Sequence, residues 1–442
     1  MVISNRGLVL GATAFVLSAI SITGAGIHQI SKGESFLRES PKEVIDEVWQ
    51  IVDRNYVDGT FNQVDWKAIR TQYLNRTYKN KEEAYSAIRE MLKRLGDPYT
   101  RFMDPEEFKN MQIDTSGELT GVGIQLAQDE KTKKLTVVAP IEDSPAATAG
   151  ILAKDIIIKI DNQSTEGMNV DKAVTLIRGP VGTKVTLTIL RGKQELVFDL
   201  RRDRIEIHPV KFTYQKTPTG AVGYIRLVQF SANAASEMRQ AIQKLEQQKV
   251  EGYILDLRSN PGGLLYSSIE IARMWIQEGS IVSTVNRQGV TDLEQANRKA
   301  LTNKPLVVLV DGGSASASEI LSGALQDNNR AVLVGTKTFG KGLVQSVRGL
   351  GDGSGMAVTI AKYLTPKGRD INKHGIDPDI VLELSEAQRQ YLSQNRDKIG
   401  SSADPQYSKA LEVLTRKIAT AKGAPVQPIK PSAVKKPVVP KK

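Results

Sequence analysis

The chain has 442 residues but no cysteine and only three histidines, His28, His208 and His374. Without cysteine it has no disulfides, no thiolate nucleophile and no cysteine-ligated zinc or iron–sulfur centre. So few histidines exclude a histidine-rich metal site, and nothing else in the sequence implies a metal or an organic cofactor. Aromatic residues make up only 5% of the chain, which argues against a base-stacking surface. We therefore expect no nucleic-acid partner.

The N-terminal residues 1–30 contain one long apolar run. Arg6 precedes an uncharged stretch from Gly7 to Ile27. Its length is near the lower limit for a membrane-spanning helix, and the small residues from Gly24 to Gly26 resemble a weak cleavage region. The segment is predicted to be a signal peptide or a membrane anchor, with membrane association in the second case. Both interpretations imply export.

The net charge of +11 is concentrated near the C-terminus. We predict a C-terminal extension over 389–442 that ends in a partly disordered tail rich in Lys and Pro. Such a composition is typical of a solvated extension. A basic tail can also associate with anionic lipid or nucleic acid.

Residues 35–112 are predicted to form a small helical domain. Ser40, Pro41 and Glu43 have the pattern of a capping box with proline at the first helical position. A second helix is predicted from Lys81 to Leu95, and Gly96 ends it. A cluster from Tyr99 to Met103 follows, which is equally compatible with packing plus a surface charge.

Residues 116–204 change to a β-rich pattern with two short helices. A hairpin is predicted over 185–190 and 195–200. Gly121, Val122, Gly123 and Ile124 lie where glycines free backbone amides beside an open strand edge. A terminal carboxylate can bind in such a nest while its peptide adds as a strand.

Residues 205–388 alternate between helix and strand, which predicts an α/β core with parallel pairing. The predicted strands include 281–285. The fold class is therefore mixed, multidomain α/β, with an inserted β-module and an N-terminal helical domain. Three predicted strand ends carry polar, glycine-rich loops, at 256–263, 311–318 and 335–342. Since ligands bind at the carboxyl ends of parallel strands, these loops predict one site.

Ser316 and Lys341 in these loops suggest nucleophilic catalysis. Ser316 lies at a strand–turn–helix junction, as an exposed nucleophile does. Lys341 has apolar and glycine neighbours, and burial can make its amine neutral at a cost of about 4 kcal/mol. The amide of Ala317 would point at the oxyanion, and Gly262 would offer a second donor.

Three alternatives remain open for these loops. Serines here can simply cap the next helix, with Ser318 favoured for that role. A Ser-His-Asp triad would have to use His208 or His374, neither of which lies at a converging strand end. Residues 335–341 match the start of a phosphate-binding loop, but Gly342 replaces the expected Ser or Thr, and a strand pattern follows.

Several segments of the sequence resemble those of two known families. GVGI at 121–124, SPAATAGILAKDIIIKIDNQ at 144–163 and RGPVGTKVTLTILR at 178–191 resemble a PDZ domain. SASASEI at 314–320, TFGKGLVQ at 338–345 and DLRSNPGG at 256–263 resemble the C-terminal processing, or tail-specific, serine proteases. TRFMDPEEF at 100–108 and SGELTGVGIQL at 116–126 are similar to the cyanobacterial and chloroplast branch.

The second resemblance implies a PDZ domain at 116–204 and a serine protease domain at 205–388 against which 35–112 packs. It implies a dyad of Ser316 and Lys341, with Gln345 orienting the amine. It also implies supporting roles for Asp256, Arg258 and Glu319, and marks Arg178 as a sensor of bound ligand. Substrates would be proteins or peptides with free C-termini, in a periplasm or thylakoid lumen, including the precursor of a photosystem II reaction-centre protein. A non-catalytic PDZ scaffold and a general periplasmic quality-control protease are the alternatives.

Overall fold

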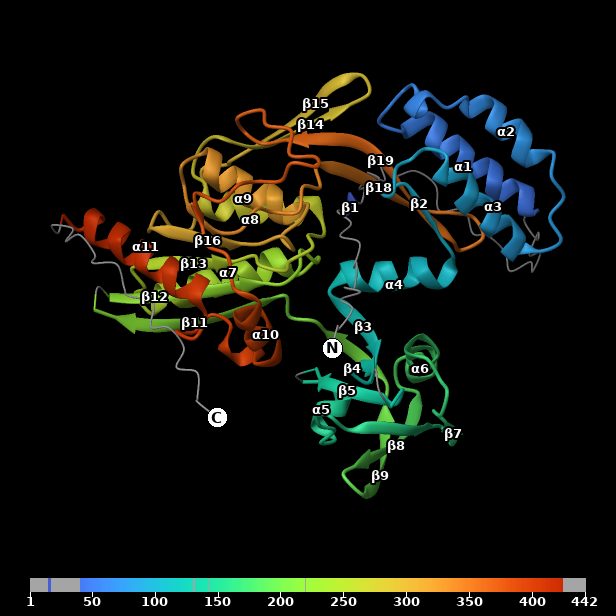
Figure 1. Ribbon diagram of the computed structural model, residues 1–442, viewed down its shortest axis with the longest axis horizontal. Coiled ribbons are helices and arrows are strands. Elements are labelled where there is room, and N and C mark those ends of the chain that lie inside the picture. Colours follow the sequence, from blue (N-terminus) through green and yellow to red (C-terminus); the bar gives the residue numbers. More distant parts are fainter. Residues whose placement is uncertain (1–14, 17–39, 130–131, 142, 219, 424–442) are drawn as a thin grey trace, which may run out of the picture.

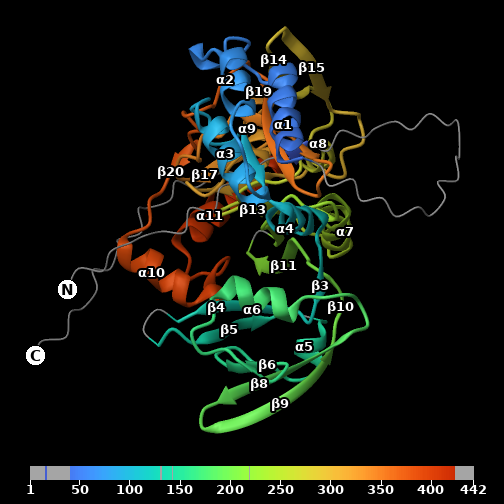
Figure 2. The ribbon, with the colours of Figure 1, turned by 90° about the vertical axis from the view of Figure 1, so that its right-hand side faces the viewer.

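The computed structural model describes residues 15–16, 40–129, 132–141, 143–218 and 220–423 (Figures 1 and 2). Apart from Phe15–Val16, the predicted signal or anchor segment at 1–30 lies outside the described residues. None of the helices in these ranges is both long and apolar enough to cross a membrane.

The N-terminal domain consists of helices α1 (Pro41–Asn55), α2 (Trp66–Leu74) and α3 (Lys81–Lys93), with a short 3-10 turn at Phe61–Gln63. Ser40 and Glu43 form the predicted capping box. The indole rings of Trp49 and Trp66 stack 6.5 Å apart in its core. Strand β2 (Arg101–Met103) and helix α4 (Pro105–Ser116) then lead to the next domain.

A small β-module is carried on a two-stranded ribbon of β3 (Glu118–Gly121) and β10 (Asp203–Glu206). Its sheet has the order β4-β5-β6-β8-β9, with β7 (Gln163–Ser164) beside β6. The strands are β4 (Ile124–Gln128), β5 (Leu135–Pro140), β6 (Ile156–Ile160), β8 (Lys184–Arg191) and β9 (Gln194–Arg201). Helices α5 (Pro145–Thr148) and α6 (Val170–Ile177) complete it. The predicted hairpin is confirmed as β8–β9.

The central sheet has the order β11-β12-β13-β16-β17-β20. Its strands are β11 (Val210–Thr217), β12 (Gly220–Leu227), β13 (Gly252–Asp256), β16 (Leu306–Val310), β17 (Val332–Gly335) and β20 (Ile380–Val381). All pairs beyond β11–β12 are parallel, as predicted. The carboxyl ends of β13, β16 and β17 therefore open at one edge.

Helices cover both faces of this sheet. On one face, α7 (Ala234–Gln247), α8 (Leu265–Trp275) and α9 (Ala317–Asp327) enclose the largest apolar core. On the other face lies α11 (Pro405–Ala421), which buries Tyr407, Ala410, Leu414 and Ile418 against the strands. Figure 1 shows α11 across the sheet. Helix α10 (Glu386–Gln394) and a 3-10 turn at Arg396–Lys398 connect β20 to α11.

The position of α11 corrects the predicted boundary at 388. Residues 405–421 are not part of an extension but a layer of the domain built on the central sheet, because their apolar side chains cover a face of that sheet. Only the end of the predicted tail, 424–442, lies outside the described residues.

A second sheet connects the core with the N-terminal helices. It contains β18 (Leu343–Gly349), β19 (Gly355–Leu364), β14 (Ser280–Asn286) and β15 (Gly289–Gln295), with β2 paired to β19. The two-residue strand β1 (Phe15–Val16) pairs in parallel with β18. The strand predicted at 281–285 exists, but it belongs to this antiparallel sheet and not to the parallel core.

Candidate active site

The three predicted loops do meet at the carboxyl edge of the central sheet. Ser314 donates its hydroxyl to the carbonyl of Leu257 at 2.8 Å, which joins the second loop to the first. The amide of Phe339 donates to the carbonyl of Ser314 at 3.1 Å, which joins the third loop to the second. Residues far apart in sequence are thus brought into one site.

Ser316 lies at the N-terminal end of α9 in a backbone conformation that residues with a Cβ seldom adopt, with φ 56° and ψ −113°. Its side chain is fully buried, and its Oγ has no hydrogen-bond partner among the described residues. Ala317 is the first residue of α9, where backbone amides have no acceptor within the helix. The turn therefore presents a hydroxyl beside an amide that can receive negative charge.

Lys341 is also fully buried. Burial lowers the pKa of its ammonium to about 7, with a further lowering from the charge of Arg101. The carboxylates of Asp97 and Glu319 act in the opposite direction. Its Nζ lies 4.8 Å from the centroid of the Tyr99 ring. Since Ser316 Oγ has no partner, the two predicted catalytic groups are close in the fold but not hydrogen-bonded to each other.

Glu319 connects the serine loop to the lysine loop. Its Oε2 accepts the amides of Ser316 at 2.8 Å and Lys341 at 2.9 Å. Its Oε1 accepts the hydroxyl of Thr338 at 2.6 Å and the amide of Gly340 at 2.7 Å. Burial raises the pKa of Glu319, and these four hydrogen bonds oppose that rise. One carboxylate thus fixes the backbone of both the serine loop and the lysine loop.

The helix cap differs from the prediction. Ser318 does not cap α9, because its hydroxyl donates to the carbonyl of Asn260 at 2.9 Å. The N-terminal amide of the turn, that of Ser316, is instead accepted by Glu319. Ser318 therefore ties the serine loop to the loop after β13.

Gly262 packs directly against the serine turn. A Cβ at this position would lie 2.9 Å from Ser316 Cβ and 3.1 Å from the amide nitrogen of Ala317, so only glycine fits. Its amide, however, donates to Asn260 Oδ1 at 2.9 Å. In this arrangement the predicted second oxyanion donor is already engaged.

Asp256 and Arg258 form a buried ion pair behind the first loop. Arg258 donates to Asp256 and also to Asp404 and Gln406 at the start of α11. Burial would raise the pKa of Asp256, but the charge and hydrogen bonds of Arg258 hold it below the usual value. The two residues therefore have supporting positions, and sequence reasoning missed their partner Asp404.

Gln345 lies on β18, four residues beyond Lys341. Its Nε2 donates to Thr359 Oγ1 at 3.3 Å, and its buried Oε1 has no partner within the described part of the chain. The strand after Lys341 is confirmed as β18, which leaves no helix for a phosphate-binding loop.

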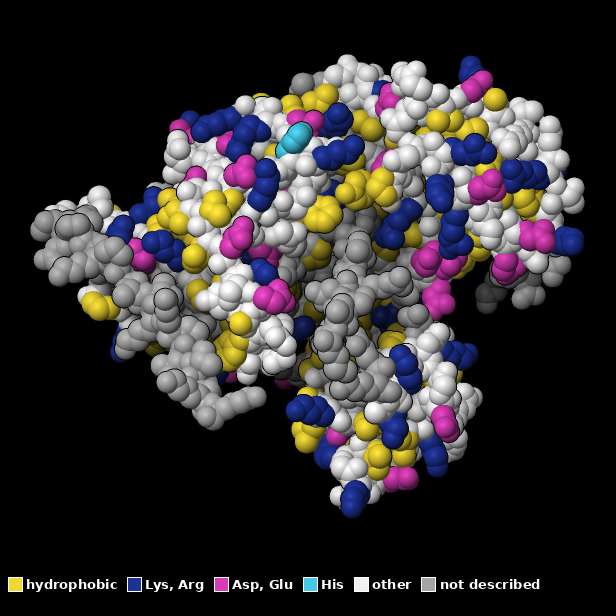
Figure 3. Space-filling model, in the orientation of Figure 1, with side chains coloured by type: hydrophobic (Ala, Val, Ile, Leu, Met, Phe, Trp, Pro, Cys, Tyr) yellow, Lys and Arg dark blue, Asp and Glu magenta, His cyan; other side chains and the backbone are white. Residues whose placement is uncertain are grey.

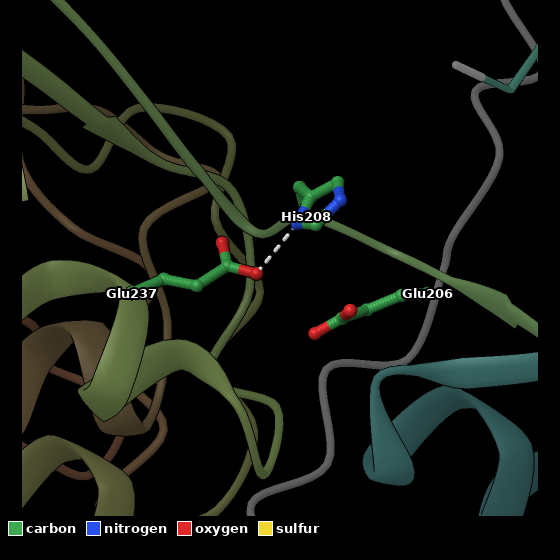
Figure 4. A group of neighbouring side chains, drawn as sticks. All are labelled: Glu206, His208 and Glu237. Carbon is green, nitrogen blue, oxygen red and sulfur yellow. Dashed lines mark hydrogen bonds and ion pairs between the residues drawn. The ribbon is translucent and has the colours of Figure 1, made fainter. Parts of the chain in front are cut away.

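The histidines do not complete a serine triad. His208 lies at the foot of the ribbon that carries the β-module, where its Nδ1 is 2.7 Å from Oε1 of Glu237 (Figure 4). That hydrogen bond raises the pKa of His208. Glu206 belongs to the same group, in which the ligand atoms of all three side chains lie within 4.8 Å of one another. The side chain of His374 is exposed to solvent.

The β-module presents an open strand edge. β4 is the edge strand of its sheet and lies beside α6. Gly121 to Ile124 form the turn into β4, in which Val122 is buried and Gly123 has φ 78°. Arg178, directly after α6, donates to Asn110 of α4, and Thr175 donates to Glu106 of α4 at 3.0 Å. The predicted sensor thus lies where the module contacts the rest of the protein.

Sequence comparisons agree with this architecture. Residues 221–382 match the model of Peptidase family S41, 136–191 that of the PDZ domain, and 37–93 that of the Tricorn protease C1 domain. A carboxyl-terminal-processing protease of Synechocystis is 47% identical, over 90% of this chain and 93% of the relative. The chloroplastic carboxyl-terminal-processing peptidase 2 of Arabidopsis thaliana is 42% identical, over 77% of this chain and 68% of the relative.

A solved structure described as a photosystem II D1 C-terminal processing protease has the same fold. The two chains superpose with a TM-score of 0.55 at 37% identity, over 83% of this chain and 99% of the other.

Proposed function

The chain belongs to the carboxyl-terminal-processing serine proteases of peptidase family S41, and from this premise we propose that Ser316 is the nucleophile and Lys341 its general base. The observation that carries the assignment is Glu319. Its one carboxylate holds the amides of both residues, so the two loops that bear them are fixed against each other. A lysine whose pKa is about 7 is partly neutral near neutral pH, as a base must be.

The chemistry follows from these positions. The neutral amine of Lys341 takes the hydroxyl proton of Ser316 as Oγ attacks the scissile carbonyl. The amide of Ala317 donates a hydrogen bond to the developing oxyanion, and the amide of Gly262 becomes a second donor once Asn260 releases it. When the tetrahedral intermediate collapses, the ammonium of Lys341 protonates the leaving amine. Water then attacks the acyl-enzyme, with Lys341 again as base, and restores Ser316.

The arrangement described is a resting one, because Ser316 Oγ has no partner and Lys341 lies over Tyr99. Activation requires the Lys341 side chain to leave this ring, lose its extra proton and reach Ser316 as a neutral amine. We infer that ligand binding to the PDZ domain favours this change through Arg178, whose contact with Asn110 links the domain to α4.

The substrate is a protein with a free C-terminus. Its end would bind beside Gly121 to Ile124 and add as a strand to the edge of β4. Residues nearer the cleavage point would add to the outer edge of β18, where β1 pairs with Gln345 and Ser346. On the face shown in Figure 3, Lys and Arg are interspersed with Asp and Glu, which suits protein substrates better than nucleic acid.

The relatives suggest a specific substrate and compartment. A solved relative is described as a D1 C-terminal processing protease of photosystem II, and others are cyanobacterial or chloroplastic. We propose that this chain matures the corresponding precursor after export, in a thylakoid lumen or periplasm.

The test is cleavage of a synthetic peptide with the C-terminal sequence of that precursor. Wild type should cleave it at one bond, and Ser316→Ala and Lys341→Ala should each lose at least about a thousandfold in kcat/KM. Ser322→Ala, a buried serine one turn and a half along α9, is the matched control. A non-catalytic scaffold predicts no cleavage that depends on Ser316. A general quality-control protease predicts equal cleavage of peptides with unrelated C-termini.

A further inference from the structure

Residues 97–100 of the N-terminal domain reach the catalytic lysine. They follow α3 and precede β2, whose pairing with β19 places Arg101 opposite Ala357. The ring of Tyr99 lies 4.8 Å from Lys341 Nζ. A loop from outside the protease domain therefore forms one wall of the dyad.

A chain of hydrogen bonds runs from this loop to Gln345. Asp97 Oδ2 accepts the hydroxyls of Thr100 at 2.8 Å and Thr359 at 2.7 Å. Asp97 Oδ1 accepts the amide of Tyr99 at 2.9 Å. Thr359 Oγ1 in turn lies 3.3 Å from Nε2 of Gln345.

The number of hydroxyl protons available in this series of hydrogen bonds sets the orientation of the Gln345 amide. A threonine hydroxyl has a single proton, and an ionised Asp97 can only accept. Thr359 gives its proton to Asp97, so its oxygen can only accept from Gln345. The NH₂ end of the amide must therefore face Thr359, and Oε1 faces away as a buried acceptor without a partner among the described residues.

We propose that Asp97 is a positioning residue of the catalytic dyad, which acts through Thr359 to keep Gln345 Oε1 available to the amine of Lys341, while Tyr99 holds the ammonium at rest. The inference rests on the proposed function, because it assumes that Lys341 is the base. Gln345 lies on β18, four residues beyond Lys341, and its Oε1 is a buried acceptor without a partner among the described residues, so it is the group that would receive the lysine amine. The N-terminal domain thereby contributes to catalysis as well as to packing.

The charges that face Lys341 make the proposal testable by pH. Asp97 and Glu319 favour the ammonium form, whereas Arg101 and burial disfavour it. Removing the charge of Asp97 should lower the pKa of the lysine further, and removing that of Arg101 should raise it. If the loop served only for packing, the two substitutions would shift the pKa of Lys341 in the same direction or not at all.

The experiment measures kcat and KM against pH for wild type, Asp97→Asn and Arg101→Gln. The apparent pKa of kcat should fall by about one unit in Asp97→Asn and rise in Arg101→Gln. In Asp97→Asn, kcat should also fall about ten- to a hundredfold with KM nearly unchanged, because Asn can donate to Thr359 and reverse the Gln345 amide. Asp46→Asn, which alters a carboxylate on α1 that pairs with Arg70 on α2, is the matched control and should keep the wild-type profile.

Thr359 provides a second readout if Asp97→Asn folds poorly. Thr359→Val keeps the shape without the hydroxyl and should lower kcat, and Thr359→Ser should recover part of the loss. Equal pKa values in wild type, Asp97→Asn and Arg101→Gln would overturn the proposal, as would equal kcat values in the Val and Ser variants. Activity in Ser316→Ala or Lys341→Ala would instead overturn the dyad itself, so the two failures are distinguishable.

Discussion

Replacing Lys341 with methionine should stabilise the protein, and the gain should depend on pH. The side chain is fully buried, and burial lowers the pKa of its ammonium from the ordinary value of 10.5 to about 7. The difference, 10.5 − 7, is 3.5 pKa units. At 1.36 kcal/mol per unit, keeping this lysine in the fold at low pH costs ~5 kcal/mol. Methionine has a similar length and carries no charge, so Lys341→Met removes that cost.

The sign of the pH dependence follows from the two pKa values. Above pH 10.5 the lysine is neutral in both the folded and the unfolded state, so it has no electrostatic cost. Between pH 10.5 and 7 the unfolded chain binds the extra proton, and the cost grows as the pH falls. Below pH 7 the cost is complete. The advantage of Lys341→Met should therefore be largest below pH 7 and decline toward pH 10.5.

Urea unfolding at several pH values between 6 and 10 measures this difference. Lys337→Met is the matched control, because Lys337 lies in the same loop with an exposed side chain, and its effect should be small at every pH. The reasoning is refuted if Lys341→Met is less stable than wild type at pH 6, or if its advantage does not change with pH.

The remaining predictions concern the supports of the dyad. Glu319→Gln places an amide NH₂ against backbone N–H donors and should lower the unfolding free energy by about 2–4 kcal/mol, measured by urea unfolding; an unchanged value contradicts the role of that carboxylate. Asp404→Asn leaves Arg258 partly unpaired and should lower the unfolding free energy by ~3 kcal/mol. Glu386→Gln removes a carboxylate from an exposed ion pair with Arg389 and should change the unfolding free energy little in the same assay. Gly262→Ala should lower kcat/KM about a hundredfold, because the added methyl group would press on Ser316. Gly150→Ala is the control, because Gly150 also has a positive φ but has open space around it, so this variant has the backbone strain without the clash.

The elements that sequence predicts well are those with strong local patterns. Alternating helix and strand over 205–388 predicts the parallel core, and that pairing alone brings three glycine-rich strand ends together. The capping box at Ser40 and the β8–β9 hairpin are likewise local and are confirmed. Ser316 and Lys341 could be selected because few other residue types in the loops can act as nucleophile and base.

Features that depend on distant partners could not be predicted. The composition of the segment around α11 suggests a solvated tail, yet Asp404 pairs with Arg258, which lies 146 residues away. The strand at 281–285 has the same local pattern in either sheet, so sequence cannot assign it. Ser318 is a good capping residue, but its hydroxyl donates to the carbonyl of Asn260, which lies 58 residues away and which no local pattern reveals. Tyr99 belongs to the cluster at 99–103, but nothing local in the sequence places its ring beside Lys341.

The central claim is that Ser316 attacks with Lys341 as a neutral base. Its most direct test is the rate at which Ser316 is acylated by a peptide substrate in a single turnover, followed by rapid quench and mass spectrometry at different pH values. The structure predicts an acyl adduct on Ser316 that forms with an apparent pKa near 7, the value to which burial lowers Lys341. An adduct on another residue, or a rate that rises only as the pH approaches 10.5, the ordinary pKa of lysine, would contradict the claim.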